Sequence, residues 1–549
     1  MATEDSGDFT FDCIVIGAGI AGLAAAESLR KAGCTSLCLL EARDRIGGRI
    51  LTQDIQETPL DLGASCIRGT SGNPLSNLNL RVHSIENVLV FDEGGNPLDA
   101  DLSNSLINTI WAAKERLKAE RKEEPAYSKL EVEDSFMGKR RKSWWERMGV
   151  SDSVERDTSS VNVNPPDLTI DLKQPIHIDE LIDAFKEEEE TISVRDWLMQ
   201  DSVLQEEFHQ TPLLRPLTNI LELTDGADLT QISFRNHSKR EFSGPHLYAP
   251  DGLWDLLKIA AGGILSTSSE VLKLNQQVTC IDYSNALESE LHPISVHTAH
   301  GTTYSAKTVI CTLPLGILQS QHQSLFHPPL PPDHQIAISK LGVGLIDKIV
   351  LEFPHPFWAA DLDGFWTFLP ESGVRRGMDF DEGAEEPGLV WFVNIEKMHR
   401  KEGVVGPAVL VAHVSQRHAR RIEEMEDGEV EDLFMDMLRL CFEREDDDGH
   451  VLVGVPEPLS VRVTRWEADP FSMGAAVYLP VRTGASIADI ITLSEPVPFP
   501  ETVNNPTGCQ AIHFAGDHTS PHHFGTVHGA LMSGLLEADN VALSLGISK

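Results

Sequence analysis

Three glycines near the start of the chain have the spacing of a phosphate-binding turn. Gly17, Gly19 and Gly22 form a G-x-G-x-x-G pattern, which follows the apolar run 11–16 and precedes a helical pattern over 23–29. In such a turn the first glycine permits a tight bend and the second lets backbone N–H groups approach a pyrophosphate. The third lets the helix pack closely on the strand. A glycine-rich turn in an ordinary α/β unit is the simpler alternative.

An acidic residue after the next apolar run favours the dinucleotide interpretation. The segment 35–40 has the composition of a second strand and ends at Glu41. A carboxylate placed about twenty residues after the glycines can bind the ribose hydroxyls of an adenine dinucleotide. The first 41 residues therefore predict a strand–helix–strand unit that binds such a cofactor.

The residues after Glu41 distinguish a flavin from a nicotinamide. Gly47 and Gly48 allow another close backbone approach to the dinucleotide, and Arg43 and Arg49 offer permanent positive charge to phosphate or to the flavin edge. At this point the chain resembles the flavin-dependent amine oxidase superfamily, whose signature is an acid followed by R-x-G-G-R. The resemblance implies FAD as the cofactor.

The segment D-L-G-A-S-C-I-R-G at 61–69 is similar to that family's D-x-G-A-x-W-I-H-G segment, which passes beside the isoalloxazine ring. The resemblance therefore assigns cofactor contacts to Gly63, Ala64 and Ser65 and substrate contacts to Cys66 and Arg68. Arg68 replaces the His or Glu that faces the amine in relatives. A fixed positive charge there should repel a polyamine at close range and, if Arg68 points into the cavity, favour a substrate with a carboxylate or another acceptor.

Lys348 is the candidate catalytic residue. Alternation over 341–353 places it with Ile346 and Val350 on one face of a strand, where a lysine is costly unless it has a partner. The family has a lysine in this G-x-x-x-K-I-x-L-x-F pattern that holds a water against flavin N5, and the resemblance implies the same role for Lys348. A lysine at a strand edge, with its amino group in solvent, is the alternative.

The late part of the chain continues the resemblance. The run 464–470 is similar to the family's T-R-W-x-x-D-P, which implies that Trp466 packs on the flavin edge. Ala475 stands where monoamine oxidases have the flavin-linking cysteine, so the FAD is predicted to be non-covalent. Ala476 and Thr526 stand where monoamine oxidases have the two tyrosines of an aromatic cage, which predicts a wider substrate pocket.

A last strand and turn at 512–520 lead to a closing helix that starts near 526. Such a helix would aim its N-terminal N–H groups at the pyrimidine end of the flavin, where negative charge gathers on reduction. The resemblance gives the remaining cofactor contacts to Val278, Gly516, Asp517, Thr526 and Val527.

These motifs predict an α/β fold in which a Rossmann-like FAD-binding domain is interleaved with an α+β substrate-binding domain. We assign 1–95, 247–325 and 460–549 to the FAD-binding domain and 96–246 and 326–459 to the substrate-binding domain. Within the latter we expect a helix over 107–121, a solvated basic helix start at 138–145, a long loop at 151–175 and a solvated helical end at Glu187–Glu190.

Composition limits the partners. The 549 residues include 45 Lys and Arg against 84 Asp and Glu, a net charge of −39, which repels nucleic acid and anionic membranes and draws cations towards an open cleft. Solubility alone would also explain this charge. Eight cysteines without a C-x-x-C pair, an acidic start and the absence of a membrane-length apolar run predict a reduced protein with an intracellular, cytoplasmic location. The ending differs from the S-K-L peroxisomal signal, and no metal site is expected.

The sequence predicts an FAD-dependent amine oxidase of the polyamine oxidase or spermine oxidase branch, with an oxidase core that is also similar to histone lysine demethylases. Its partners are an amine and O₂: a hydride passes to the flavin, the imine is hydrolysed, and O₂ reoxidises the flavin to give H₂O₂. Two alternatives remain open. One is an oxidase of an amino acid or an acidic amine metabolite, and the other is a non-catalytic, flavin-bound scaffold.

Overall fold

The computed structural model describes residues 9–120, 192–234, 242 and 244–547, apart from gaps at 79, 268–269, 285–292, 370–387, 401–405, 446–450 and 501–509. The expectations for 138–145, 151–175 and Glu187–Glu190 fall outside the described residues. No helix within the described ranges has both the length and the apolarity needed to cross a bilayer.

The first sheet is built around β1 (Phe9–Ile16), whose inner half is buried on both faces. Strand β1 lies parallel to β11 (Thr303–Cys311) on one side and to β2 (Leu37–Leu40) on the other. A sheet that is covered on both faces requires continuous apolar strands, and β1 and β2 have them. The other members are β8 (Leu272–Lys273), β9 (Val278–Asp282), β10 (Ile294–Thr298), β12 (Phe326–His327), β22 (Val497–Pro498) and β23 (Gln510–Phe514).

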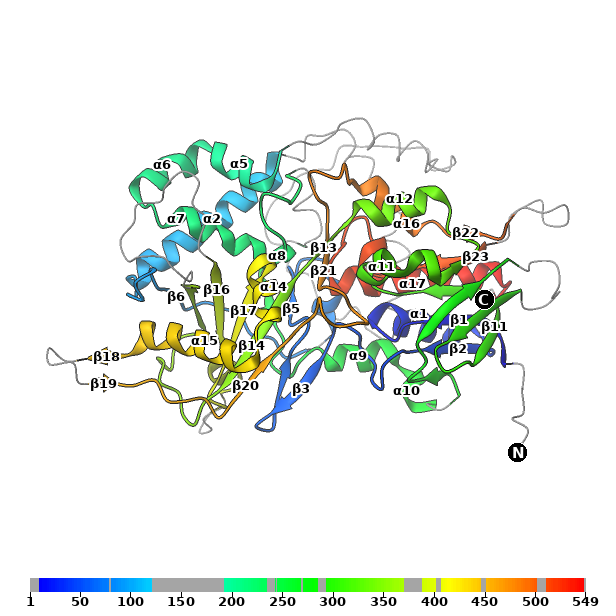
Figure 1. Cartoon of the computed structure of the whole chain (residues 1–549), viewed down its shortest axis with the longest axis horizontal. Helices are drawn as coiled ribbons and strands as arrows, with labels where there is room; N and C mark the ends of the chain where they lie inside the picture. Colours follow the sequence, from blue (N-terminus) through cyan, green and yellow to red (C-terminus); the bar gives the residue numbers. More distant parts are fainter. Residues whose placement is uncertain are drawn as a thin grey trace, which may run out of the picture.

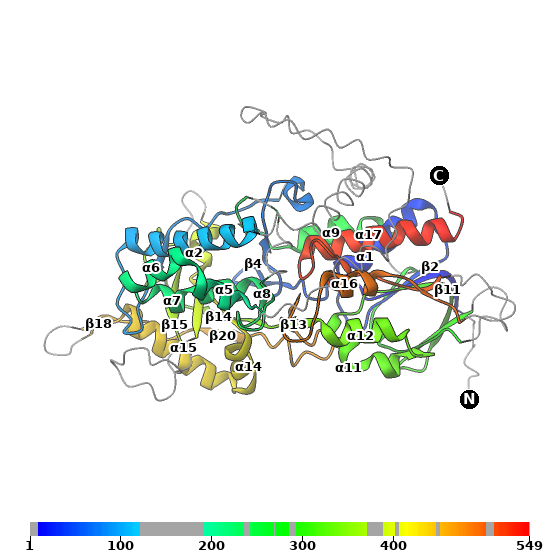
Figure 2. The same ribbon diagram turned by 90° about the horizontal axis from the view of Figure 1, so that it is seen from above.

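Helices cover both faces of this sheet. Cys13 and Val15 of β1 pack in a core with α1 (Ile20–Ala32), α9 (Trp254–Ala261), α10 (Gly263–Thr267) and α17 (Val527–Ser544). Ile14 and Ile16 point the other way, into a core with α11 (Leu315–Leu325), α12 (Pro332–Lys340) and α16 (Ile487–Ser494). Figure 2 shows α1, α9 and α17 on one side of the sheet and α11 and α12 on the other.

Within the described residues, the second sheet has six strands in the order β20 (Ser460–Val463), β14 (Ile346–Glu352), β17 (Val409–Ser415), β16 (Leu389–Asn394), β15 (Gly364–Phe368) and β6 (Val88–Val90). All neighbours are antiparallel except β15 and β6, which are parallel. It forms the other half of the molecule in Figure 1.

Helices also cover this second sheet. One apolar core joins its first face to α2 (Ala100–Glu120), α5 (Val194–Gln200), α6 (Ser202–Gln210) and α7 (Leu214–Leu217). The opposite face packs on α14 (Gln416–Glu424) and α15 (Asp427–Phe442). The shorter elements are α8 (Glu222–Asp225), α13 (Ile395–His399) and the strand pairs β3 (Thr52–Ile55) with β4 (Thr58–Asp61), β5 (Cys66–Ile67) with β7 (Leu247–Tyr248), β13 (Gly342–Gly344) with β21 (Ala476–Tyr478), and β18 (Arg444–Glu445) with β19 (Val451–Val453).

The predicted fold class, a Rossmann-like unit joined to an α+β unit, is confirmed, and the helix expected over 107–121 is α2. The domain boundaries stay a prediction. Strand pairing places β6 and β20 in the second sheet, although both lie in segments that we assigned to the FAD-binding domain. The boundaries near 95 and 460 would therefore move to positions before Val88 and after Val463, since a strand belongs with the sheet whose hydrogen bonds it completes.

Candidate active site

A cavity of about 850 Å³ is lined by residues of both sheets. One part of its wall comes from the turns that follow β1 and β2, and another from β14, β15, β16, β17 and one side of α2. The first part carries the glycine motifs and the second carries Lys348. A single cavity thus brings the two predicted functions together.

The glycine turn has the shape that a pyrophosphate requires. Gly17 has φ +98°, a conformation that favours glycine, and a Cβ on Gly22 would lie 1.9 Å from the Gly17 carbonyl oxygen. A Cβ on Gly19 would meet no protein atom within 4 Å. Gly19 is also the N-cap of α1 and gives no side-chain cap to its N–H groups. The open space at Gly19 therefore faces a helix N-terminus, which suits an anion.

Glu41 is fixed at the end of β2 by backbone donors. Its Oε2 accepts a hydrogen bond of 2.8 Å from the Ala18 N–H, and its Oε1 accepts one of 2.9 Å from the Arg43 N–H. The side chain is buried and lines the cavity. Each carboxylate oxygen keeps a further lone pair that can accept from a ribose hydroxyl.

The two predicted phosphate-binding arginines already have carboxylate partners. Arg43 makes a bidentate pair with Asp469 at 2.9 and 2.7 Å, and Arg49 pairs with Asp517 at 2.5 Å. The Arg49 charge, together with His518, holds the pKa of the buried Asp517 carboxyl well below its usual range, although burial alone would raise it. Both arginines lie at the cavity wall, but they act there as members of ion pairs rather than as spare cations.

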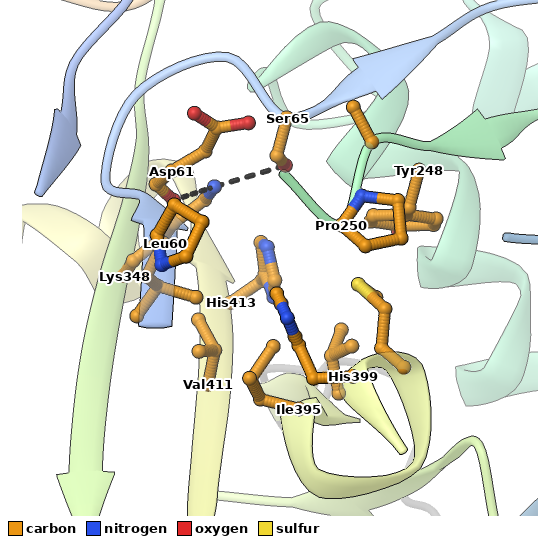
Figure 3. A pocket seen from close by; sticks show the side chains of 14 residues that line it. Leu60, Asp61, Ser65, Tyr248, Pro250, Lys348, Ile395, His399, Val411 and His413 are labelled. Carbon is orange, nitrogen blue, oxygen red and sulfur yellow. Dashed lines mark hydrogen bonds between the residues drawn. The ribbon is translucent and has the colours of Figure 1, made fainter. Parts of the chain in front are cut away.

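Lys348 lies on β14 and is buried, as its apolar neighbours predicted, and its amino group is fully partnered. Its Nζ donates to the carbonyl oxygens of Asp61 at 2.8 Å and Gly63 at 2.7 Å and to Ser65 Oγ at 2.9 Å. Figure 3 shows the side chain pointing towards Asp61 and Ser65. These contacts exclude the alternative of an edge lysine in solvent.

Burial sets the protonation of this lysine. Removal from water lowers the pKa of Lys348 to about 8, although the nearby Asp61 carboxyl acts in the opposite direction. Burial also raises the pKa of Asp61 to about 6, against a hydrogen bond from Thr52 and the charge of Lys348. Lys348 can therefore gain and lose a proton near neutral pH.

A row of four side chains crosses the second sheet. Lys348 is opposite His413, His413 is opposite Trp391, and Trp391 is opposite Trp366. Residues directly opposite each other on antiparallel strands share a face of the sheet, and all four line the large cavity. Burial lowers the pKa of His413 to about 3, as does the charge of Lys348 to a smaller extent, so His413 is neutral at physiological pH.

A smaller cavity of about 30 Å³ shares Ser65, Tyr248, Lys348 and His413 with the large one (Figure 3). Its volume suits a water molecule, which needs about 10–15 Å³ and several polar partners.

The family model for flavin containing amine oxidoreductases matches residues 20–542. The chain belongs to this family. It is 30% identical over 542 residues to Lysine-specific histone demethylase 1 homolog 3 of Arabidopsis thaliana, a match that covers 96% of this chain and 29% of the relative. It is 28% identical over 541 residues to Lysine-specific histone demethylase 2 of Homo sapiens, covering 96% and 53%. Against Polyamine oxidase 4 of Oryza sativa subsp. japonica the identity is 27% over 547 residues, covering 96% and 87%.

The chain therefore spans about half or less of the length of these two demethylases and most of the polyamine oxidase. Among solved structures, putrescine oxidase bound to putrescine matches with a TM-score of 0.61 and 16% identity, covering 98% of this chain and 100% of that one. At this identity the likeness shows the fold.

The cofactor of this amine oxidoreductase is FAD, and the residues present fit it. The open space at Gly19 suits the pyrophosphate, and Glu41 suits the ribose. The cavity volume of about 850 Å³ is within the range of cofactor sites. The cofactor residues predicted from the sequence lie on the cavity wall, with one exception: Gly17, Gly19, Glu41, Arg43, Gly47, Gly48, Arg49, Gly63, Ala64, Ser65, Val278, Trp466, Gly516, Asp517, Thr526 and Val527. The exception is Gly22, which packs behind the turn.

The predicted substrate residues Cys66, Arg68, Ala476 and Thr526 also line the cavity. Arg68 is half-buried, and its guanidinium donates to the Thr224 carbonyl oxygen. Thr526 is the N-cap of α17, where its hydroxyl accepts from the Gly529 N–H at 3.0 Å. Within the described residues, no group of three or more His, Cys, Asp and Glu side chains could hold a metal ion.

Asp347 supports the cofactor wall from behind. Its Oδ1 accepts hydrogen bonds from Thr464 Oγ1 at 2.7 Å and from the Trp466 N–H at 3.1 Å. Burial raises the pKa of Asp347 to about 8, and the neighbouring Glu423 carboxyl raises it further against the Thr464 bond. A protonated Asp347 therefore fixes the backbone that presents Trp466 to the cavity.

The sequence did not indicate Tyr248, Trp366, Trp391 and His413 as wall residues. His413 is the one of the four that a sequence pattern could have indicated, because it is a single polar residue within the apolar run of β17. His413, Trp391 and Trp366 share a face with Lys348, which only the register of β14, β17, β16 and β15 reveals.

Proposed function

We propose that the chain is an FAD-dependent oxidase of polyamine-like amines, which cleaves a C–N bond and releases H₂O₂. The observation that carries this proposal is a fully partnered lysine with a pKa of about 8, which shares one large cavity with the dinucleotide turn. The balanced reaction is R–CH₂–NH–R′ + O₂ + H₂O giving R–CHO, R′–NH₂ and H₂O₂. FAD supplies the acceptor for the hydride when it is bound.

The exposed part of the cavity wall suits a cationic substrate. Glu86 and Glu115 are exposed side chains that also line the cavity, and Asn104 and Asn108 of α2 accompany them. Carboxylates at the exposed part of a cavity raise the local concentration of cations, and the net charge of −39 adds to that field.

Lys348 and Ser65 act on protons rather than on the hydride. The amine must be neutral to lose hydride, and reduction of O₂ to H₂O₂ consumes protons. A lysine that titrates near pH 8 can accept the first proton and return one later. Ser65 Oγ accepts from Lys348, so its own hydroxyl proton can point to a water in the small cavity that both residues line.

Ala475 carries a second part of the proposal, the non-covalent attachment of FAD. It lies at the cavity wall, and an alanine has no group that can form a thioether to the flavin. Acid or heat denaturation followed by filtration should release the yellow cofactor. Flavin that stays with the precipitated chain would contradict this.

A second candidate, oxidation of an amino acid or an acidic amine metabolite, rests on Arg68 at the cavity wall. A peroxide-release assay over spermine, acetylspermine, monoamines and amino acids separates the two. Turnover of spermine or acetylspermine supports the polyamine proposal, and turnover of amino acids alone supports the second. No peroxide from any of them, with FAD bound, would favour the non-catalytic scaffold.

A further inference from the structure

The row Lys348, His413, Trp391 and Trp366 runs across four neighbouring strands on one wall of the cavity. Neighbouring strands lie about 4.8 Å apart, so the row extends for about 14 Å from Lys348 to Trp366. The reacting end of a substrate lies by Lys348 under the proposed function. A long substrate that follows the row would thus bring its remote end to the two tryptophans.

The two indoles are held firmly. Trp366 and Trp391 are buried, with ring centroids 4.8 Å apart and planes inclined by 32°. Trp391 also shares a hydrogen bond with the Tyr248 hydroxyl, and Tyr248 is itself on the cavity wall. The pair belongs to the apolar core beneath α2, against which Trp111 packs. A preformed aromatic surface of this kind loses little conformational entropy when it binds a ligand.

The surroundings favour a cation on this surface. His413, between the lysine and the tryptophans, carries no charge at physiological pH, and the Lys348 ammonium is directed to three protein oxygens. Glu86 and Glu115 supply negative charge at the exposed part of the same cavity. The neighbouring indole of Trp111 has the protein's own ammonium on its face, since Lys114 Nζ lies 5.0 Å from the centre of that ring.

We propose that Trp391 and Trp366 form the subsite for the distal cationic end of the substrate, an ammonium or N-alkylated ammonium group joined to the oxidised C–N bond by a long alkyl chain. The proposal rests on the proposed amine oxidase function and adds the chemical nature of the substrate's distal end, which must carry a positive charge. The indole faces attract the cation through their quadrupoles, and the alkyl chain covers the wall between. The subsite thus selects for length and for distal charge together.

Two substitutions separate attraction for a cation from simple apolar packing. Trp391→Phe keeps an aromatic face, whereas Trp391→Leu keeps apolar area and removes the face. The same pair at Trp366 tests the second ring and serves if a Trp391 variant does not fold. Trp254→Leu on α9, an exposed tryptophan that is absent from the cavity wall, is the matched control for loss of an indole. Retained FAD absorbance verifies the fold of each variant.

The first measurement is kcat/KM for α,ω-diamines of increasing length, for monoalkylamines of equal length and for diamines acetylated at the far nitrogen. With long diamines we expect Trp391→Leu to lose about three- to thirtyfold and Trp391→Phe to lose less, as cation–π energies of about 0.5–2 kcal/mol imply. The monoalkylamines and acetylated diamines should change by less than about threefold. Equal losses for charged and uncharged ends, or a preference for a distal aryl or carboxylate group, would overturn the proposal.

The second measurement requires no turnover. An α,ω-bis(trimethylammonium) alkane has no nitrogen lone pair and cannot be oxidised to an imine, so its Kd can be read by calorimetry or from the flavin absorbance of the holoenzyme. Trp391→Leu and Trp366→Leu should weaken its binding, and Trp254→Leu should not. An unchanged Kd in both cavity variants would overturn the subsite. If instead no amine is oxidised while the probe still binds through the tryptophans, the proposed function fails and the subsite stands.

Discussion

The cofactor side and the substrate side of the cavity are built in different ways. The cofactor side includes short continuous segments, within 17–21, 41–49 and 63–65, in which spacing along the chain fixes spacing in the molecule. The substrate side comes from single residues of β14, β17, β16 and β15 and from one side of α2. Local backbone geometry dictates the first, and strand register dictates the second. We therefore expect a small substitution on the cofactor side to disturb the structure more than one on the substrate side.

The largest expected effect is on the cofactor side, at Gly22. Gly22→Ala would place a Cβ 1.9 Å from the Gly17 carbonyl oxygen, a backbone atom that cannot move without opening the turn. Alanine is otherwise better than glycine in a helix by about 1 kcal/mol, so any loss of stability comes from the clash. We expect a lower Tm and loss of bound FAD.

Gly19→Ala is the matched variant, because its Cβ would meet no protein atom. It should keep the Tm of the FAD-free chain and weaken FAD binding alone. Equal Tm values for FAD-free Gly22→Ala and Gly19→Ala would show that the close packing of α1 on the turn is unimportant.

Lys348→Met gives the next effect and tests the lysine at the boundary of the two sides. Methionine fills similar space without the charge or the donors, so FAD should remain bound. Reduction, reoxidation or both should slow by at least about tenfold, the low end for loss of a positioned proton-handling group. In stopped-flow traces the inflection near pH 8 should also disappear.

Lys340→Met, a change of a more exposed lysine on α12, is the control and should match the unmodified enzyme. Traces for Lys348→Met that match in both half-reactions and keep the pH inflection would remove Lys348 from the mechanism.

The same difference between local backbone geometry and strand register explains which features of the molecule could be predicted from the sequence. The glycine turn, Glu41 and Lys348 were predicted because each lies in a local pattern with a physical reason. The partners of Arg43 and Arg49 were not, since Asp469 and Asp517 are more than 400 residues away and nothing local indicates the pairing. Trp366, Trp391 and His413 escaped for a related reason: alternation shows that residues share a face within one strand, but not which residues of other strands lie beside them.

A smaller effect concerns pH and stability at Asp347. The pKa of Asp347 is about 8 in the folded protein and about 3.9 in an unfolded chain. The folded state therefore holds this proton more tightly, so its contribution to stability is full below pH 4 and is lost as pH rises to about 8. Asp347→Asn should remove this dependence and gain at least about 1 kcal/mol relative to the unmodified enzyme between pH 5 and pH 9.

Urea unfolding of FAD-saturated protein at the two pH values measures this difference. Asp436→Asn, at a side chain that is 75% exposed, is the control and should leave the pH dependence unchanged. If Asp347→Asn follows the unmodified enzyme at both pH values, the Asp347 carboxyl is not the group that retains a proton.

The smallest effect lies on the substrate side, at Arg68. Its guanidinium is half-buried at the cavity wall and donates to the Thr224 carbonyl oxygen, so water screens part of its charge from a ligand. Arg68→His should shift the ratio of kcat/KM for spermine over an amino acid towards spermine by about two- to fivefold, the range for a screened charge. Ala476 and Thr526 should leave benzylamine a poor substrate in both forms, because neither supplies an aromatic wall. An unchanged ratio in Arg68→His would mean that the charge of this arginine does not act on the substrate. In that case the aromatic row and the acidic residues at the exposed part of the cavity wall, rather than the segment beside the flavin, decide which amine reaches Lys348.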